Sequence, residues 1–498
     1  MAEYLHGAYG QINTVANRVS DESLSAIVCI GTAPVHTIEG GASKVNTPIL
    51  INNIAEAKKY LGYSDDWASY TLCEAMHVFF EHKGVGPVVF INVLNPATHK
   101  AATATTATKT PENGKITLAN AEDIILDTVV IKTGTGQDAA TKVKGTDYNI
   151  AYNADKKTIV ITEVTNGSLG TAALTLTYDT IDVEAVTDAV VIGSSDGLGL
   201  NTGVYAIKDV YQLTGYIPAY LIAPGFSSHP AVHAAMYENS VKINGHWDAY
   251  MFVDLPIVNG TTALTMDTIV AYKNSNGYTH ENETVYFPLI SGTDGNIYHI
   301  STLAAANFQE LLIAQEGIPY RTASNTECAL IENLYLGETN VGRLFDDSLI
   351  NEKLNKNGIA SAAFVGGRWA IWGAHSADYN QDDMTPVNVA ETNRMMLYYI
   401  SNDFQSRRTL DVDKPLTPND IKTIVSEEQT RLDALVAIGA LTFAEAMLNA
   451  TAQERSDIIY GDWQFAFNVT TTPLAKSLKA VVNWTDDGFE TYFEEEAE

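Results

Sequence analysis

The chain has 498 residues, 46% of them hydrophobic, so it is long enough for about three domains with full-sized cores. It carries 60 acidic and 30 basic residues, which gives a formal net charge of −30. A chain this acidic lacks the basic surface that binding to nucleic acid or to an anionic membrane requires, so we expect no direct contact with either. Solubility explains the charge most simply, although it also suits a partner with a basic surface.

The three cysteines, Cys29, Cys73 and Cys328, are far apart and lie in apolar stretches. They predict neither a disulfide framework nor a zinc-binding motif. The N-terminus has no charged segment followed by an apolar core, and no run of about 18 apolar residues occurs in the sequence. We therefore expect neither a signal peptide nor a membrane span, in a protein that is made in a cytoplasm and used there or released from it.

Residues 1–20 do not show the pattern of a domain. Glycines and asparagines interrupt a weak alternation of apolar residues, to which Tyr9, Ile12 and Val15 belong. A local core cannot be built from these residues, so we expect either a frayed terminus or an arm that pairs elsewhere.

From residue 23 onward the pattern becomes that of an α/β domain. Apolar runs predict buried strands at 26–31 and 87–94, and helical spacing predicts helices at 54–61 and 67–81. This strand–helix–helix–strand order implies parallel pairing with a right-handed crossover.

The pattern changes at residues 97–200, which we predict to be an inserted all-β domain. It begins with a linker-like stretch at 100–114 that is rich in threonine and alanine. Helical periodicity is then absent, and the alternating pattern predicts strands at 115–118, 124–132, 148–152, 158–164 and 173–183. We expect these strands to form a β-sandwich or barrel.

The α/β alternation resumes at Gly203. The pattern predicts helices at 204–214, 230–243, 263–274 and 299–314, and strands at 219–223, 249–254 and 284–288. Such alternation predicts a doubly wound sheet with helices on both faces. We therefore assign residues 21–96 and 201–343 to one α/β core domain.

Residues 344–485 are predicted to form an α+β C-terminal domain. Its central feature is the stretch 366–375, in which Trp369 and Ile371 alternate with Ala370 and Trp372. Apolar residues on both faces predict a central strand that is covered on both sides.

The rest of this domain is predicted as helices followed by strands. One helix spans 389–400, and a second begins at Thr417 and Pro418, which suit a cap and a first turn, and ends at Gly439. Strands are predicted at 463–469 and 478–484. Residues 486–498 then turn into a short strand-like segment and acidic residues; like the N-terminus, this segment lies at a chain end without a core.

Patterns of catalysis are weak at the carboxyl ends of the predicted strands, where a doubly wound sheet can hold a ligand. After the first strand there is one glycine, Gly31, and then Pro34, with no helix N-terminus to hold a phosphate, and the glycines at 197–203 have the wrong spacing for a phosphate-binding loop. Asp254 ends a strand and is explained more simply as the cap of a turn than as a catalytic carboxylate. Residues 227–229 are interpreted as a helix cap before Pro230 and not as a nucleophile elbow.

Patterns of metal binding are also weak. His280 lacks the second histidine of a metalloprotease helix, and the 11 histidines are scattered along the chain. We therefore predict no catalytic residues, no cofactor and no metal site.

A series of short motifs in a fixed order resembles the contractile-tail sheath proteins, the polymers around the tubes of contractile phages and phage-tail-like bacteriocins. Together they span most of the chain except the predicted insertion. The motifs lie at residues 25–33, 47–62, 79–94, 286–288, 317–325, 354–359, 366–375 and 389–400. This sequence departs from the family at His375 and Ser376, where Arg-Thr is usual, and at Asn393, where the family has paired arginines.

The resemblance implies a structural subunit that polymerises helically around a tail tube and contracts to drive the tube through a cell envelope. Its implied partners are other copies of itself, the tail tube protein, and baseplate and tail terminator proteins. Its implied location is a virion or phage-tail-like particle, assembled in the cytoplasm of the host bacterium. The fold class implied is a multidomain α/β protein with a doubly wound core, an inserted all-β domain, an α+β C-terminal domain and extended arms at both ends.

The resemblance also assigns roles to particular residues. The two terminal segments, 1–20 and 486–498, become arms that add strands to the sheets of neighbouring subunits. Their apolar residues are Tyr9, Ile12, Val15, Phe489, Tyr492 and Phe493. The C-terminal domain is expected to face the tube, and the helix that begins at Pro418 to lie near that contact. We expect the acidic residues of that helix to lie opposite its apolar face: Glu427, Glu428 and Asp433.

Two other classes of protein fit the residues less well. An acidic α/β enzyme or binding protein with a β insertion is disfavoured because no site is recognisable. A self-assembling surface-layer protein, which the threonine-rich region suggests, is disfavoured because no signal peptide is recognisable.

Overall fold

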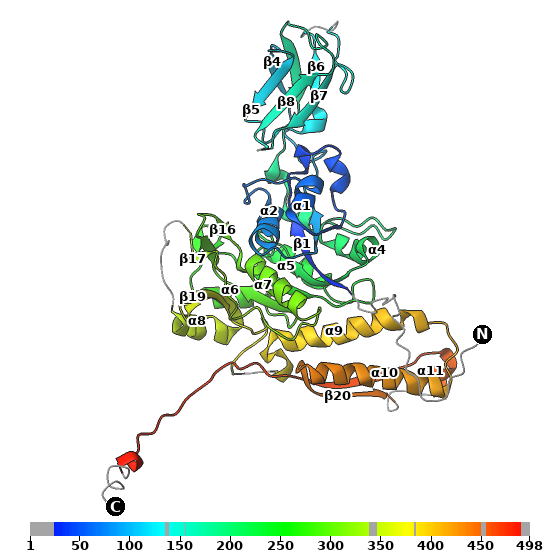
Figure 1. Ribbon diagram of the computed structural model, residues 1–498, viewed down its shortest axis with the longest axis vertical. Helices are drawn as coiled ribbons and strands as arrows, with labels where there is room; N and C mark the ends of the chain where they lie inside the picture. Colours follow the sequence, from blue (N-terminus) through cyan, green and yellow to red (C-terminus); the bar gives the residue numbers. More distant parts are fainter. Residues whose placement is uncertain are drawn as a thin grey trace, which may run out of the picture. The chain divides into compact units, whose positions relative to one another are not determined.

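The computed structural model describes residues 24–134, 139–154, 156–337, 346–382, 385–449 and 455–489 (Figure 1). They fall into two compact units, which divide between Pro415 and Leu416. Among the described residues, no helix has both the length and the apolar composition needed to cross a membrane. The predicted arm residues Tyr9, Ile12, Val15, Tyr492 and Phe493 lie outside the described residues.

The first unit is built on an eight-stranded sheet with the order β19-β18-β14-β11-β10-β1-β3-β2. Its strands are β1 (Ser25–Gly31), β2 (Ile49–Ile51), β3 (Val88–Asn92), β10 (Ile217–Ile222), β11 (Tyr250–Asp254), β14 (Glu283–Tyr286), β18 (Ile359–Val365) and β19 (Arg368–Trp372). The strands from β3 to β18 are parallel, and an antiparallel strand lies at each edge. The predicted parallel pairing of the first two buried strands, β1 and β3, is confirmed.

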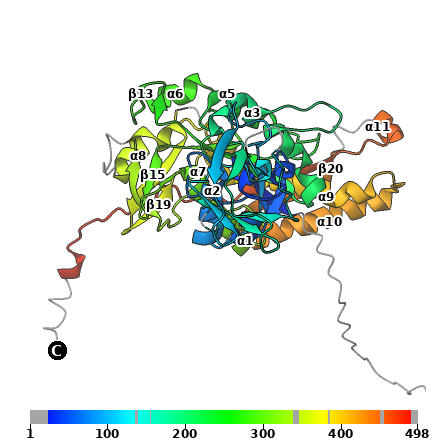
Figure 2. The same ribbon diagram turned by 90° about the horizontal axis from the view of Figure 1, so that it is seen from above.

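The helices of this unit connect and cover the strands. They are α1 (Ile54–Tyr60), α2 (Thr71–Met76), α3 (Asp188–Ile192), α4 (Val210–Thr214), α5 (Pro230–Glu238), α6 (Ile269–Ser275), α7 (Ile300–Ala314), α8 (Asp347–Lys353) and α9 (Glu391–Arg408). Short 3-10 helices include η6 (Gly203–Asp209), and a π-helix, η3 (His77–His82), continues α2. In Figure 2, α5 and α6 lie on one side of the sheet and α1 on the other, as a doubly wound arrangement requires.

The first unit also contains smaller sheets besides the eight-stranded one. A three-stranded sheet joins β15 (Leu289–Gly292), β16 (Ile297–Tyr298) and β17 (Ile331–Tyr335). A hairpin of β12 (Val258–Asn259) and β13 (Thr262–Ala263) precedes α6, so the helix that we predicted from residue 263 begins only at Ile269.

The insertion has its own core and two antiparallel sheets, β4-β9-β6 and β5-β8-β7 (cyan and teal in Figure 1). Its strands are β4 (Thr105–Lys109), β5 (Lys115–Ala119), β6 (Val130–Lys132), β7 (Tyr148–Tyr152), β8 (Thr158–Glu163) and β9 (Leu174–Tyr178). Strand β4 lies where we predicted a linker. Its threonines are mostly exposed, so it lacks the apolar alternation that marks a half-buried strand.

The insertion ends earlier than the predicted residue 200. Ala101 N–H donates to Thr180 O and Asp182 N–H donates to His99 O, which fastens its two ends side by side. Helix α3 follows, and Val191 in it is fully buried in the main core. Residues 183–200 therefore pack with the α/β core.

The tryptophan-rich stretch forms an edge strand of the main sheet, β19, and the prediction of a central strand is wrong. The segment 325–328 covers its outer edge: Asn325 N–H donates to Ile371 O, Ile371 N–H to Thr326 O and Cys328 N–H to Trp369 O. A covered edge can carry apolar side chains on both faces, so the pattern resembles that of a central strand. Since β18 and β19 join this sheet, the boundary predicted at residue 344 is also wrong.

The second unit contains α10 (Pro418–Ala437), β20 (Leu441–Leu448), α11 (Arg455–Tyr460), β21 (Phe465–Thr471) and the 3-10 helix η11 (Asp487–Phe489). Helix α10 begins as predicted, with Pro418 in its first turn and a reciprocal capping box between Thr417 and Asp420. β20 and β21 pair antiparallel, and β20 packs on α10. The strand that we predicted at 478–484 does not form, since residues 472–485 are neither helix nor strand.

Candidate functional site

The carboxyl edge of the parallel sheet is where catalysis would be expected in a fold of this kind. A cavity of about 460 Å³ opens there, and its lining includes Asp188, His229, Asp254 and His299. These titratable side chains come from the start of α3, the start of α5, the end of β11 and the start of α7.

The buried acids of this edge hold the N-terminus of α7. Asp254 Oδ1 accepts a hydrogen bond from Ser301 N at 3.0 Å, and the Ser301 hydroxyl donates to Asp254 Oδ2. Glu74 accepts hydrogen bonds from His299 N and from its ring Nδ1, both at 2.7 Å. Carboxylates at this position compensate the unpaired N–H groups and the positive end of the helix dipole. We predicted that Asp254 caps a turn at the end of its strand; it caps the start of helix α7 instead.

The pKa values of His299 and Asp254 follow from burial and from the charges beside them. Burial alone would lower the pKa of His299, but the Glu74 carboxylate beside it raises this pKa to about 9. Burial raises the pKa of Asp254. Ser301 is completely buried and its hydroxyl is engaged by Asp254, so it is not presented to a substrate.

The predicted helix cap at residues 227–229 is wrong in its details. His229 is the N-cap of α5, but its side chain makes no capping hydrogen bond. Its ring Nδ1 lies 2.6 Å from Asp188 Oδ1, and Ser227 Oγ accepts from Asp254 N at 3.1 Å. The side chains of this segment thus join neighbouring elements and leave the helix start uncapped.

The histidines are less scattered in space than along the chain. His233 and His280 lie beside Glu283 inside the first unit, and the ligand atoms of the three residues fall within 4.8 Å of one another. We predicted no metal site because the histidines are scattered along the chain, and His233 lies far in the sequence from His280 and Glu283.

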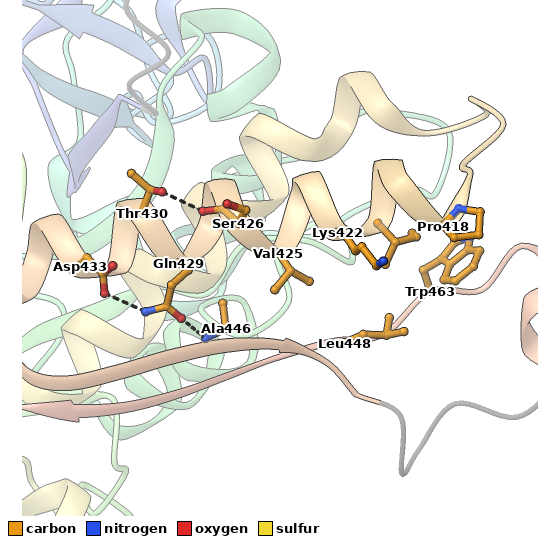
Figure 3. A pocket seen from close by; sticks show the side chains of 11 residues that line it. Pro418, Lys422, Val425, Ser426, Gln429, Thr430, Asp433, Ala446, Leu448 and Trp463 are labelled. Atoms are coloured by element: carbon orange, nitrogen blue, oxygen red, sulfur yellow. Dashed lines mark hydrogen bonds between the residues drawn. The ribbon is translucent and has the colours of Figure 1, made fainter.

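In the second unit, a groove of about 800 Å³ is lined by α10, β20 and Trp463, which precedes β21 (Figure 3). Its floor is mixed: Val425, Leu448 and Trp463 are apolar, while Ser426 and Thr430 are polar. The groove was not predicted, because β20 itself was not recognised in the sequence.

Gln429 fastens the outer edge of β20 to α10. Its Oε1 accepts from Ala446 N at 2.7 Å, and its Nε2 donates to Asp433 Oδ1 at 2.7 Å (Figure 3). The same Nε2 also donates to Ala444 O at 3.1 Å. A side-chain amide thus takes the donor and acceptor positions that a neighbouring strand would use. Edge strands left without such protection pair readily with other chains.

The acidic residues of α10 do not share one face, contrary to our prediction. Glu427 and Asp433 are exposed, but Glu428 is only 3% exposed. Glu428 lies four residues from both Ile424 and Leu432, so helical geometry places it on the buried face with them. The interpretation that Glu428 lies opposite the apolar face is therefore wrong.

The chain after β21 leaves its apolar side chains in solvent. Residues 472–485 run as an extended trace into η11, drawn in red in Figures 1 and 2. The large exposed apolar side chains of this segment are Leu478, Val481, Val482, Trp484 and Phe489. Trp484 is 80% exposed, which is costly for so large an apolar side chain unless another surface covers it.

Comparisons with known proteins place this fold. No family model matches the chain. The tail sheath protein of Burkholderia phage BcepMu is 32% identical to it over 265 residues, which are 52% of this chain and 50% of the relative. The match thus spans about half the length of this curated relative.

Solved structures match over nearly the whole chain. A chain of the anti-feeding prophage helical sheath in the contracted state has a TM-score of 0.54 at 12% identity, with 98% of this chain and 100% of that chain covered. A chain of the extracellular contractile injection system PVC sheath complex, also contracted, has a TM-score of 0.55 at 10% identity, with 98% and 99% covered. At such identities the likeness establishes the fold, which is that of these contractile-sheath chains.

Proposed function

We propose that this chain, a homologue of a tail sheath protein with the fold of contractile-sheath chains, is the structural subunit of a contractile tail sheath. In this role it polymerises helically around a tail tube and contracts to drive the tube through a cell envelope. The observation that carries the proposal is the fold match over 98% of the chain to a chain of a contracted sheath. The 32% identity to a tail sheath protein over half the chain supports it independently.

The proposed partners are those of a tail particle. They are further copies of the chain, a tail tube protein, and baseplate and tail terminator proteins, in a particle assembled in the cytoplasm of a host bacterium. A fold match to a chain of the anti-feeding prophage baseplate structure supports the baseplate partner, with a TM-score of 0.55 at 12% identity. We propose no catalytic role, and the capping bonds at the carboxyl edge of the sheet support that assignment.

The terminal segments, 1–20 and 486–498, are proposed as arms that link subunits by adding strands to neighbouring sheets. The exposed apolar side chains of residues 478–489 support this role, because strand pairing with a neighbour would cover them. The C-terminal arm therefore begins earlier in this proposal, soon after Thr471. Among the described residues the β20–β21 sheet has two strands, and a strand from a neighbour would extend it on the β21 side, since Gln429 occupies the outer edge of β20.

The second unit is proposed to face the tube, with Glu427 and Asp433 of α10 near the contact. Both side chains are exposed, which a contact requires. Glu428 is no longer part of this proposal because it is buried. The insertion, which we now bound at about residues 100–182, is proposed as an accessory domain of the subunit.

Negative-stain electron microscopy of the purified, untagged chain tests the proposed function, with and without the tube protein from the same source. We expect striated tubes or stacked rings, and longer, more regular tubes when the tube protein is present. A monodisperse monomer under both conditions, over a range of salt and protein concentrations, would overturn the proposal.

A further inference from the structure

Three metal-ligating side chains converge in the interior of the first unit. His233 lies on α5, His280 lies in the segment between α6 and β14, and Glu283 is the first residue of β14. Each offers one ligand atom, and the three atoms lie within 4.8 Å of one another. His233 and Glu283 are 50 residues apart in the sequence, so folding brings them together.

The contacts within the group are short. His233 Nε2 lies 2.6 Å from Glu283 Oε2, and the second carboxylate oxygen, Oε1, accepts from His280 N at 3.1 Å. The side chains of His233 and Glu283 are 1% and 0% exposed, while His280 is partly exposed. Two ligands are thus sealed from water, and the third borders the surface from which an ion can arrive.

Aromatic neighbours fix both imidazole rings. The His233 ring stacks on Tyr278 with 4.0 Å between ring centroids, and the His280 ring stacks on Tyr237 at 3.5 Å and 8°. Side chains whose rotamers are locked by packing lose little entropy when an ion binds, so the group is organised in advance.

No lysine or arginine forms an ion pair with Glu283 among the described residues. The buried Lys273 donates instead to the carbonyl of Ala377. Burial lowers the pKa of Lys273, and the nearby charge of Glu283 acts in the opposite direction. A buried carboxylate needs a hydrogen-bonded or charged partner, and here the imidazole of His233 supplies it. A cation bound between His233 and Glu283 would also compensate the buried carboxylate.

We propose that His233, His280 and Glu283 bind one Zn²⁺ ion. Two imidazole nitrogens and one carboxylate oxygen are a zinc ligand set, with water in the fourth position, whereas Ca²⁺ and Mg²⁺ prefer oxygen ligands alone. Zinc ligands in a tetrahedron are about 3.3 Å apart, given bonds of about 2.0–2.2 Å. The 2.6 Å contact of His233 with Glu283 must therefore open by less than about 1 Å. His233 Nε2 gives up its proton as the ion takes that place.

The ion would tie α5 to the first residue of β14. The site lies within one unit and uses none of the residues assigned to the arms or to the tube contact. It therefore concerns the stability of the subunit, and its failure would leave the proposed function as it is.

Zinc binding is tested on the full, untagged chain after treatment with a chelator and buffer exchange. We expect one equivalent of Zn²⁺ per chain by elemental analysis, a thermal unfolding midpoint that rises by several degrees with Zn²⁺, and Co²⁺ absorption bands of a four-coordinate site. His280→Gln removes the partly exposed ligand and spares the buried pair, so circular dichroism should show an unchanged fold. It should weaken Zn²⁺ affinity by roughly tenfold or more.

The matched control is His77→Gln, because His77 forms a comparable pair with Glu81 at 2.9 Å, and no third ligand joins this pair in the part of the chain that the structure describes. It should leave Zn²⁺ affinity unchanged. Sub-stoichiometric zinc in the wild-type chain, or equal affinity in the wild type and His280→Gln, would overturn the proposal.

Discussion

The Glu74 carboxylate accepts two hydrogen bonds from His299, while the Asp254 carboxylate accepts two from Ser301. Both acids therefore act on the first residues of α7, which begins at Ile300. Their arrangement shows how an edge that holds catalytic groups in many α/β enzymes can be occupied by structural bonds. The pair of the partly buried His299 with the buried Glu74 also makes the stability of the subunit depend on pH.

Glu74→Gln should destabilise the chain by about 1.5–3 kcal/mol at pH 6.5, since it replaces charged hydrogen bonds by neutral ones. The folded-state pKa of His299, about 9, lies above the unfolded value of about 6.5. The protonated ring thus stabilises the fold fully below pH of about 6.5, and this stabilisation is lost as the pH rises through about 9.

Thermal unfolding between pH 6 and pH of about 9 measures this effect. The wild-type midpoint should fall over that range, and Glu74→Gln should lose this part of the dependence. Glu81→Gln, at a more exposed pair with His77, serves as the control and should behave like the wild type. Parallel pH profiles for Glu74→Gln and the wild type would contradict the assignment.

The acidic residues of α10 show what helical spacing decides and what it leaves open. The positions of Ile424 and Leu432 suffice to place Glu428 on the buried face, so this error could have been avoided from the sequence alone. The exposure of Glu427 follows from the same periodicity. Whether an exposed acid meets a partner cannot be read from periodicity, because solvated faces have the same pattern.

Glu427→Lys should weaken attachment of the sheath to the tube and leave contacts between sheath subunits intact. An exposed ion pair contributes only about 0.2–1 kcal/mol, but the contact repeats in every subunit. Attachment of the wild-type sheath should also weaken with salt, since exposed charges are screened beyond about 8 Å at physiological ionic strength.

Co-sedimentation of sheath with tubes at low and high salt measures the attachment. Glu112→Lys, which reverses an exposed charge in the insertion, is the control with the same change of net charge. Equal co-sedimentation of Glu427→Lys and Glu112→Lys at both salt concentrations would show that α10 does not make the contact.

Strands were predictable where their partners lie in the same core and unpredictable where they do not. The apolar runs of β1, β3 and β11 predict buried parallel strands because both faces of the sheet are covered by the chain itself. Strand β20 has exposed and half-buried positions without a regular alternation, so it gave no clear signal. Residues 478–484 show the alternation of a strand but have no strand partner among the described residues of the chain.

The position of a strand within a sheet is a second limit. β19 lies at an edge, yet the segment 325–328 supplies the hydrogen bonds that a neighbouring strand would give. Local sequence cannot reveal that a segment some forty residues away covers the edge. The candidate metal site escaped notice for a similar reason, since His233 on α5 meets Glu283, the first residue of β14, across fifty residues of sequence.

Excision of residues 101–180 tests whether the insertion is a separate folding element. The hydrogen bonds of Ala101 with Thr180 and of Asp182 with His99 hold its ends together, so a short Gly/Ser linker can replace it. We expect a folded chain that still polymerises, with sheaths of altered outer profile by microscopy. The midpoint of thermal unfolding of the remaining chain should fall only slightly, because Ile125 is the one removed residue, among those described, that belongs to the main hydrophobic core.

The comparison variant removes residues 101–198, as the sequence-based boundaries would suggest. It also deletes α3 and the buried Val191. The lost core packing should lower the free energy of unfolding by roughly 2–4 kcal/mol or more, so this variant should unfold at a lower temperature. Equal stability of the two variants would contradict the boundary that we draw at residue 182.

Assembly of the whole particle depends, in our proposal, on segments that contribute little to the fold of one subunit. A strand of five or six hydrogen bonds contributes about 0.5–1.5 kcal/mol per bond, before the cost of ordering the arm is subtracted. One such strand would be a weak link. Two per subunit, repeated through a lattice, give avidity far beyond either contact and keep neighbours connected while the folded units change their packing.

Two truncations test this arrangement: deletion of residues 1–18, and termination after Thr472, which removes the exposed apolar segment with Leu478, Val482 and Trp484. Each should give a folded chain with an unchanged thermal midpoint; for the second truncation the reason is that the described residues it removes, 473–489, are exposed except for the half-buried Leu474. Neither should form tubes by negative-stain microscopy, whereas the chain without residues 101–180 should. Mixing the two truncated chains separates the arms further: if each arm needs an acceptor on a neighbour, the mixture should form short, irregular assemblies at most. Tubes of normal length from either truncation alone would show that the lattice is held by the folded units and not by the arms.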